Sequence, residues 1–262
     1  MLSALKKLRF KLFLFFLVVF VATYFLQDNY KFVKEISKES LKWPVQTDVS
    51  EENPINFNKN GFAYSVYPVA EYDISGLVVH KLDYNKWYSL SRTDELFTTD
   101  LCIIWGGNLA SGNYRSLATS VSQDQRFCFF KYSYDKPMNN SEISNNHLLV
   151  NNPKIEKALA DIRAGDQVRI RGFLADVNAV ALGETKKYEW KEAGWKTSVS
   201  RDDGGAGACE IIYVKELQIL KKGNFILHLL HDVSKWAILL IIVWVFGEML
   251  LEAFGGKLKT RY

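Results

Sequence analysis

The sequence predicts a mainly β ectodomain of the α+β class, folded as an antiparallel barrel or sandwich and held between two terminal transmembrane helices. Two long apolar segments near the ends, residues 12–28 and 236–254, predict the helices. Between them, residues 61–222 contain short runs of β-branched and aromatic residues bounded by turn-forming residues, a pattern typical of strands. One amphipathic segment in this region predicts a single helix within the domain.

The first apolar segment, LFLFFLVVFVATYFL (residues 12–26), contains no charged residue. With its flanks it reaches the roughly 20 residues that cross a bilayer as a helix. A cleaved signal peptide is the alternative, but VATYFLQDNY offers a poor cleavage site. We therefore expect an uncleaved anchor after a basic segment, residues 1–11, which contains four cations: Lys6, Lys7, Arg9 and Lys11.

The second apolar segment, from Trp236 to Phe254, would be about 28 Å long as a helix, close to the thickness of the hydrocarbon core. Its two acidic residues, Glu248 and Glu252, lie one turn apart near its end. A carboxylate costs much less there than at mid-bilayer, so interfacial positions are the simpler interpretation. In the alternative, Glu248 faces a partner helix in a complex.

Residues 223–235 are expected to form a juxtamembrane helix before this second span. Its His228 and His231 are three residues apart and share a helical face. They could form a metal or haem pair, but an amphipathic turn at the membrane interface is the better interpretation.

Lys and Arg residues flank both spans, including those of the tail, residues 255–262. Cytoplasmic segments of membrane proteins carry an excess of Lys and Arg, so we expect both termini in the cytoplasm and the central domain outside. This topology predicts a protein of a bacterial inner (plasma) membrane with a periplasmic domain. The lipid bilayer is its first expected partner.

The basic character of the chain belongs to its ends. The whole chain has a net charge of +4, but residues 27–234 carry 25 basic and 27 acidic residues. A basic surface of the kind that binds nucleic acid is therefore not indicated, and no nucleic-acid partner is expected.

The order of the other elements follows from local composition. Residues 29–60 are polar and charged and predict a stalk, helical at first and looser after Pro44. A hairpin with SQDQ at its turn is expected within residues 114–134. The remaining strands are expected at residues 72–82, 86–91, 101–105, 165–177, 195–201 and 209–220.

The helix of the domain has signals at both of its ends. Asn152 can cap it, Pro153 suits the first helical position, and Gly165 suits the terminating left-handed position. In the strand that follows, Gly172 interrupts the alternation of apolar residues, which often marks a bend or a bulge.

The three cysteines are Cys102, Cys128 and Cys209. In an oxidising space two of them can pair. DLCIIWG and RFCFFKY both predict buried strands, so we favour a Cys102–Cys128 disulfide, although spacing alone does not determine connectivity. No C-x-x-C motif is present, so neither a thioredoxin-type motif nor a zinc knuckle is indicated.

The phrase GDQVRIRGFL resembles the first strand of small OB-type barrels, in which a Gly-Asp turn leads into a strongly bent strand. The resemblance covers residues 165–220 and implies an OB-like part in the domain. OB-type barrels often bind oligonucleotides or sugars. The combination of DLCIIWG, SNNHLL, GDQVRIRG and GACEIIYV also resembles an uncharacterised family of membrane-anchored bacterial proteins, which implies no activity.

The loop RDDGGAGACE, residues 201–210, is the most suggestive motif. It lacks the lysine of a phosphate-binding loop and leads into a strand instead of a helix, so we favour a hairpin turn. Asp202 and Asp203 could hold a divalent cation, but their spacing does not match a calcium loop. A nuclease-like site is a further alternative, with Arg201, Asp202 and Glu210 as its residues.

Three other residues are candidates for ligand contacts. His147 could be a general base or a metal ligand, or could pair with one of the thiols as a nucleophilic site, but a structural role is the simpler interpretation. Trp190 and Trp195 could stack on sugars or bases, or could pack in the domain.

No paired catalytic signature appears in the sequence. We therefore expect a non-enzymatic binding or assembly subunit of an envelope complex, without cofactor or metal. Its protein partners would contact the ectodomain and the second span. The alternatives are a membrane-tethered hydrolase that uses residues 201–210, and a carrier of a small ligand or metal on the OB-like face.

Overall fold

The computed structural model describes residues 2–49, 53–83, 97–124, 127–183, 191–200 and 209–258. The chain forms two compact units. One comprises Met1–Asn29 and Asn224–Tyr262 and contains the two long terminal helices; the other, Tyr30–Gly223, contains the sheets and is named the ectodomain here for the location that the sequence predicts. The strand at 86–91 that the sequence predicts lies outside the described residues.

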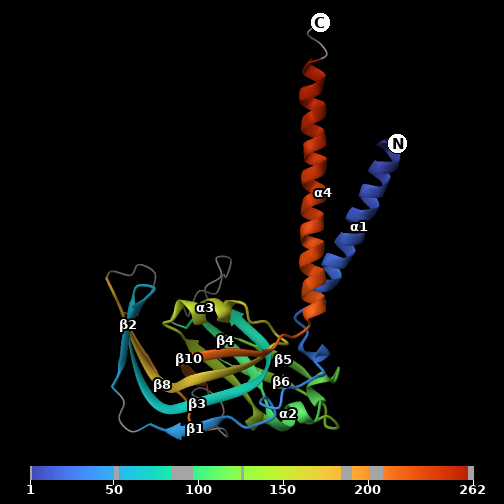
Figure 1. The fold of residues 1–262 in the computed structure, drawn as a ribbon. Helices are drawn as coiled ribbons and strands as arrows, with labels where there is room; N and C mark the ends of the chain where they lie inside the picture. Colours follow the sequence, from blue (N-terminus) through green and yellow to red (C-terminus); the bar gives the residue numbers. More distant parts are fainter. Residues whose placement is uncertain are drawn as a thin grey trace. The chain divides into compact units, whose positions relative to one another are not determined.

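Two long apolar helices make up the first unit, α1 (Leu2–Leu26) and α4 (Phe225–Leu258). Both are long and apolar enough to cross a membrane, over Ala4–Leu26 and Phe225–Phe254. They run antiparallel, so that Leu2 and Leu258 lie at the same end of the pair (Figure 1). The expected juxtamembrane helix and second span form one continuous helix, because no glycine or proline interrupts residues 225–246.

Polar side chains join the two helices along their length. Arg9 of α1 forms an ion pair with Glu248 of α4 at 2.6 Å. Nearer the other end, the ring of His231 stacks on Phe20 with centroids 4.5 Å apart, and its Nδ1 lies 3.2 Å from Thr23 Oγ1. Glu248 therefore faces a neighbouring helix of its own chain.

The ectodomain contains a large mixed sheet. Its strands are β1 (Val45–Asp48), β2 (Ile55–Lys59), β3 (Phe62–Asp83), β4 (Thr99–Ile104), β7 (Ile143–Leu149), β8 (Gln167–Ala181), β9 (Glu192–Trp195) and β10 (Glu210–Lys221). Strands β5 (Ser120–Gln123) and β6 (Cys128–Lys131) form the separate hairpin that the sequence predicts. The short helices are α2 (Gly106–Ala110), α3 (Pro153–Ala160), η1 (Tyr30–Phe32), η2 (Asn113–Arg115) and η3 (Asn140–Glu142).

Strand pairing in the large sheet closes on itself. Neighbours follow in the order β3, β4, β7, β10 and β8, and β8 pairs again with β3 along residues 167–181 and 62–77. All of these pairs are antiparallel except β7 with β10, which is parallel. β1 and β2 pair with β3 (Figure 1), and β9 pairs with β8. Strands β8, β9 and β10, which lie in the region of the OB-like resemblance, thus share one sheet with the strands before them.

Helix α3 lies in the chain between β7 and β8 and begins as its sequence predicts. The Asn152 side chain accepts a hydrogen bond from the Lys154 N–H, and Pro153 takes the first turn. The helix ends earlier than predicted, at Ala160, with Asp161 as its C-cap. Gly165, which adopts φ +98°, belongs to the turn before β8 and does not terminate the helix.

The bend predicted at Gly172 is present. Opposite this glycine, the pairing of β8 with β10 shifts register between Val214 and Glu216. A Cβ at position 172 would overlap the carbonyl oxygen of Tyr213. Glycine is therefore required where the two backbones approach most closely.

The described residues of the predicted stalk, 29–49 and 53–60, are part of the ectodomain from Tyr30 onward. Tyr30 and Val33 join a buried cluster with Leu77, Cys102 and other apolar residues. Ile55 and Phe57 of β2 pack against a second cluster. The physical reason is that the few apolar side chains of this polar segment are spaced so that they pack against the clusters of the sheet. The predicted strand at 195–201 also differs, since β9 ends at Trp195.

Candidate functional site

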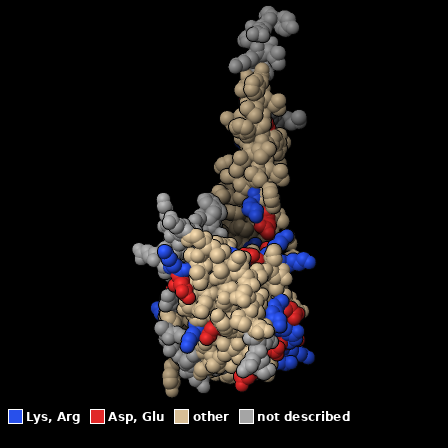
Figure 2. Space-filling view, turned by 90° about the vertical axis from the view of Figure 1, so that its left-hand side faces the viewer, with Lys and Arg blue, Asp and Glu red and all other residues tan. Residues whose placement is uncertain are grey.

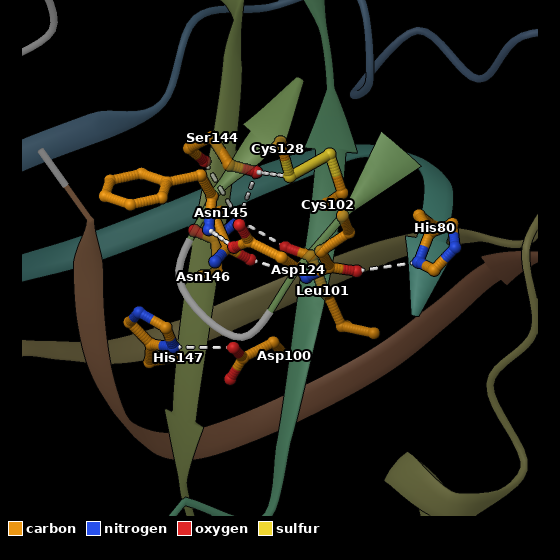
Figure 3. The surroundings of a disulfide bond; sticks show 12 residues. His80, Asp100, Leu101, Cys102, Asp124, Cys128, Ser144, Asn145, Asn146 and His147 are labelled. Carbon is orange, nitrogen blue, oxygen red and sulfur yellow. Dashed lines mark hydrogen bonds and ion pairs between the residues drawn. A yellow bond between two sulfur atoms is a disulfide. The ribbon is translucent and has the colours of Figure 1, made fainter. Parts of the chain in front are cut away.

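An ion pair between two buried side chains is the centre of the candidate site. Asp100 on β4 stands directly opposite His147 on β7, and the carboxylate Oδ2 lies 2.7 Å from Nδ1 of the ring (Figure 3). The exposed fraction of the side chain is 9% for His147 and 0% for Asp100. A buried carboxylate requires such a partner, because desolvation of an isolated charge is costly.

Cys209 completes the group from a third element. Ile211 on β10 pairs with His147 in parallel register, and Cys209 lies two residues before it, just ahead of the strand. Interaction with Cys209 is one of the causes that raise the pKa of His147. Cys209 itself is partly exposed.

The charge of His147 depends on these two neighbours. Burial lowers the pKa of His147, but the hydrogen bonds and charges of Asp100 and Cys209 outweigh burial and raise this pKa to about 10. The imidazole is therefore cationic at neutral pH. The carboxylate of Asp100 lies against it.

The backbone around Cys209 is held by the segment that follows β9. The Ser198 N–H donates to the Cys209 carbonyl at 3.0 Å, and the Ile211 N–H donates to Thr197 Oγ1 at 3.0 Å. The Thr197 N–H in turn donates to Asp176 Oδ1. These bonds tie the start of β10 to the segment after β9 and, through Asp176, to β8.

One aromatic ring covers the imidazole, and a second packs against the first. Phe97, just before β4, stacks on His147 with centroids 5.1 Å apart, and Trp195 at the end of β9 meets Phe97 edge-on at 5.8 Å. We call Phe97, Asp100, His147, Trp195 and Cys209 together the thiol cluster. Its aromatic members pack against one another, which supports the packing interpretation of Trp195.

The structure brings together only some of the candidates that the sequence suggests. His147, Trp195 and Cys209 meet in the thiol cluster, and the neighbouring Glu210 is buried opposite Asn146. Arg201, Asp202, Asp203 and Trp190 lie outside the described residues, so the cation, nuclease and turn interpretations of their loop stay predictions. Within the part of the chain that is described, no group of three or more His, Cys, Asp or Glu side chains could hold a metal ion.

His228 and His231 both contact α1. His228 Nδ1 lies 3.0 Å from Gln27 Oε1, and its Nε2 lies 3.8 Å from Asp28. His231 stacks on Phe20, as described above. Both histidine rings of α4 therefore take part in the packing of α4 against α1.

The structure brings the favoured cysteine pair together. Cys102 on β4 and Cys128 on β6 have their sulfur atoms 2.10 Å apart and their Cα atoms 6.0 Å apart (Figure 3). This is disulfide distance. The third cysteine, Cys209, lies outside this pair.

Sequence reasoning missed Asp100 and Phe97. The available signal was a carboxylate at the start of the run TDLCII, every residue of which is buried. An acidic residue in a buried strand needs a buried partner. The sequence offers both His80 and His147 as partners of a suitable type. Only the pairing of β4 with β7 shows that the partner is His147.

Comparisons with protein-family models, with curated proteins and with solved structures give no match for this chain. The functional conclusions therefore rest on the contacts of the described residues. Asp100 can orient the imidazole of His147 and stabilise its positive charge.

Proposed function

We propose that this chain is a membrane-anchored binding or assembly module of an envelope protein complex. The supporting observation is an exposed edge strand, β1, that borders a charged groove on the ectodomain. The helical unit would anchor the chain, and the ectodomain would present this edge to a partner protein.

The groove spans several neighbouring strands. It has a volume of about 400 Å³ and is lined by residues of β1, β3, β8 and β10. Its charges have both signs: Glu71, Asp73, Arg171, Lys215 and Glu216. Asp73 accepts from Arg169 at 2.6 Å and from Arg171 at 3.1 Å. The hydrogen bond from Arg169 is the main cause that lowers the pKa of Asp73.

Strand β1 has backbone groups that another strand could use. All four of its residues are exposed, and within the described ranges it pairs only with β3. An extended peptide can add to such an edge through main-chain hydrogen bonds, with side-chain contacts to neighbouring residues giving specificity. We therefore commit to an extended segment of a partner protein, with charges of both signs, as the occupant.

We also propose that the ectodomain is OB-like. The closed order β3, β4, β7, β10 and β8 supports this, as do the parallel pair β7–β10 and the helix between β7 and β8. An OB-type fold has five strands with the same order of pairing, in which the third and fifth strands are neighbours. On this proposal the first strand is β3, and the GDQVRIRGFL strand is the fourth.

A role in nucleic-acid binding has little support from the charges. On the ectodomain face drawn in Figure 2, acidic side chains lie next to basic ones along its edge. Residues 27–234 contain fewer basic than acidic residues. A protein segment is the partner that this mixed surface fits better.

The test is site-specific crosslinking in cells. A photoreactive amino acid at Thr47, on the exposed edge strand, should crosslink the full-length chain to one or a few defined proteins. The same amino acid at Lys157, an exposed residue on α3, is the matched control and should not capture them. Equal capture from both positions, or none from Thr47, would contradict a partner at the β1 edge.

A further inference from the structure

We infer that the groove between α1 and α4 binds an anionic phospholipid, with the phosphate group at Lys6 and Arg9 and an acyl chain along the apolar residues beyond them. The inference rests on the membrane anchoring proposed above, and it does not depend on the β1 edge of the ectodomain. It adds a lipid-binding site to the helical unit.

The groove is formed by one face of each helix. It has a volume of about 530 Å³, which lies within the roughly 300–1,000 Å³ of small-molecule sites. On α1 it is lined by Lys6, Arg9, Phe10 and Phe13. These residues follow spacings of three and four and therefore share one side of the helix. The α4 residues that line the groove, between Ile241 and Met249, are all apolar.

The two cations lie at one end of the groove. Because the helices are antiparallel and Arg9 contacts Glu248, the cations lie near the Met249 end, and Phe13 lies further along, towards Ile241. A ligand that fills the groove must therefore carry negative charge at one end and be apolar along the rest. A phospholipid has this arrangement, and basic pockets between membrane-spanning helices are known to bind anionic headgroups.

Arg9 is held at the mouth of the groove by two contacts. Its Nη1 donates to the Glu248 carboxylate at 2.6 Å, and the central carbon of the guanidinium lies 5.5 Å from the centroid of the Trp244 ring. A guanidinium has five N–H donors in a fixed plane. Arg9 can therefore hold Glu248 and donate to a phosphate oxygen at the same time.

Lys6 can bind a phosphate at little cost. Its side chain is 54% exposed, and its Nζ lies 3.9 Å from Glu252, which is too far for a hydrogen bond. An exposed ion pair of this kind contributes little to stability. A phosphate that accepts a hydrogen bond from Lys6 therefore disturbs no strong interaction between Lys6 and Glu252.

The balance of charge favours an anionic headgroup over a zwitterionic one. Residues 1–11 contain four cations, and the second span contains two carboxylates, Glu248 and Glu252, so these groups together carry a net charge of +2. Each basic residue near the membrane surface strengthens attraction to anionic lipid. A zwitterionic lipid has no net charge with which to balance this excess.

The experiment uses the full-length chain in phosphatidylcholine vesicles that contain a trace of a photoreactive lipid. One probe is phosphatidylglycerol with a diazirine in one acyl chain, and the other is phosphatidylcholine with the same chains. We expect the anionic probe to label the peptides that contain Phe13 and Ile242, and unlabelled phosphatidylglycerol to compete with it. The zwitterionic probe should label the same peptides much less.

The charge of Lys6 is tested by Lys6→Gln. The amount of anionic probe that gives half-maximal labelling should rise about five-fold, the size of effect expected for one basic residue near the membrane surface. Lys7→Gln is the matched control, because it removes the same charge from a neighbouring exposed residue that does not line the groove. An equal effect of both changes would show a general surface attraction and would overturn the site.

The place of the acyl chain is tested by Val245→Phe, which narrows the groove without changing any charge. Labelling by the anionic probe should fall. Val243→Phe makes the same change at an α4 position that is 59% exposed and does not line the groove, so labelling should be retained. Unchanged labelling in Val245→Phe would show that the chain of the lipid lies elsewhere.

Two further results concern the wild-type chain and do not require that any variant folds. Equal labelling by the anionic and zwitterionic probes would show that the groove holds bulk lipid without preference, which overturns the lipid site and leaves the membrane anchor intact. If neither probe labels α1 or α4, the helices do not lie in the bilayer, and both the lipid site and the anchor proposed above are wrong. Crosslinking from Thr47 reports only on the β1 edge, so the two proposals are tested separately.

Discussion

At the scale of the residue, His147 links the stability of the ectodomain to pH. Its pKa is raised from 6.5 to about 10, so the folded chain binds this proton more tightly than the unfolded chain does. The resulting stabilisation is fully present below about pH 6.5 and is lost as the pH rises towards about 10.

His147→Gln should therefore lower the free energy of unfolding of the ectodomain most at low pH. Loss of the cation leaves Asp100 buried without its partner, a change that typically costs about 3–5 kcal/mol. Thermal melts of both proteins between pH 6 and pH 10 should give a difference in Tm that is largest near pH 6 and shrinks towards pH 10. His80→Gln serves as the control. A difference that does not change with pH would show that His147 is not charged in the folded state.

The same residues show where reading the sequence reaches its limit. The sequence marked His147, Trp195 and Cys209 as residues of interest, because each is a reactive or aromatic type in a short distinctive motif. It could not group them or add Asp100, because they come from separate strands. The grouping depends on the pairing of β4 with β7 and of β7 with β10.

At the scale of the element, local signals predicted much of the ectodomain correctly. The β5–β6 hairpin, the start of α3 and the long strand β10 follow from turn residues, capping and apolar runs. Residues 30–60 were misread as a stalk. Their apolar residues are few and widely spaced, so the sequence alone does not show that they are buried. Their packing follows only from the pairing of β2 with β3 and from the cluster against which they lie.

Gly172 offers a test of the bend between β8 and β10. In Gly172→Ala the new methyl group would meet the Tyr213 carbonyl, so one of the two backbones must move. Forced movement of this kind typically costs about 1–3 kcal/mol, and the chemical denaturation midpoint should fall accordingly. Gly247→Ala in α4, where nothing lies within 4 Å of the added atom, is the matched control. An unchanged midpoint for Gly172→Ala would show that the bulge adapts without strain.

At the scale of the whole molecule, two apolar helices at the ends and a folded domain between them predict the path of the chain across a membrane. The helices are antiparallel partners, joined by Arg9 and Glu248 near one end. Cations concentrate on the outer flanks of both spans, and such segments stay in the cytoplasm. The ectodomain would then lie on the opposite side of the membrane from both termini.

Protease protection tests this path directly. In spheroplasts of cells that carry the chain with a C-terminal tag, added protease should degrade residues 30–223 and leave a tagged fragment that contains α4. In inverted membrane vesicles the pattern should reverse, with loss of the tag and survival of the ectodomain. Exposed loops are cut first, whereas spanning helices are protected by the bilayer. Loss of the tag in intact spheroplasts, with the ectodomain protected, would place the thiol cluster in the reducing cytoplasm, where the Cys102–Cys128 pair would not be expected to stay oxidised.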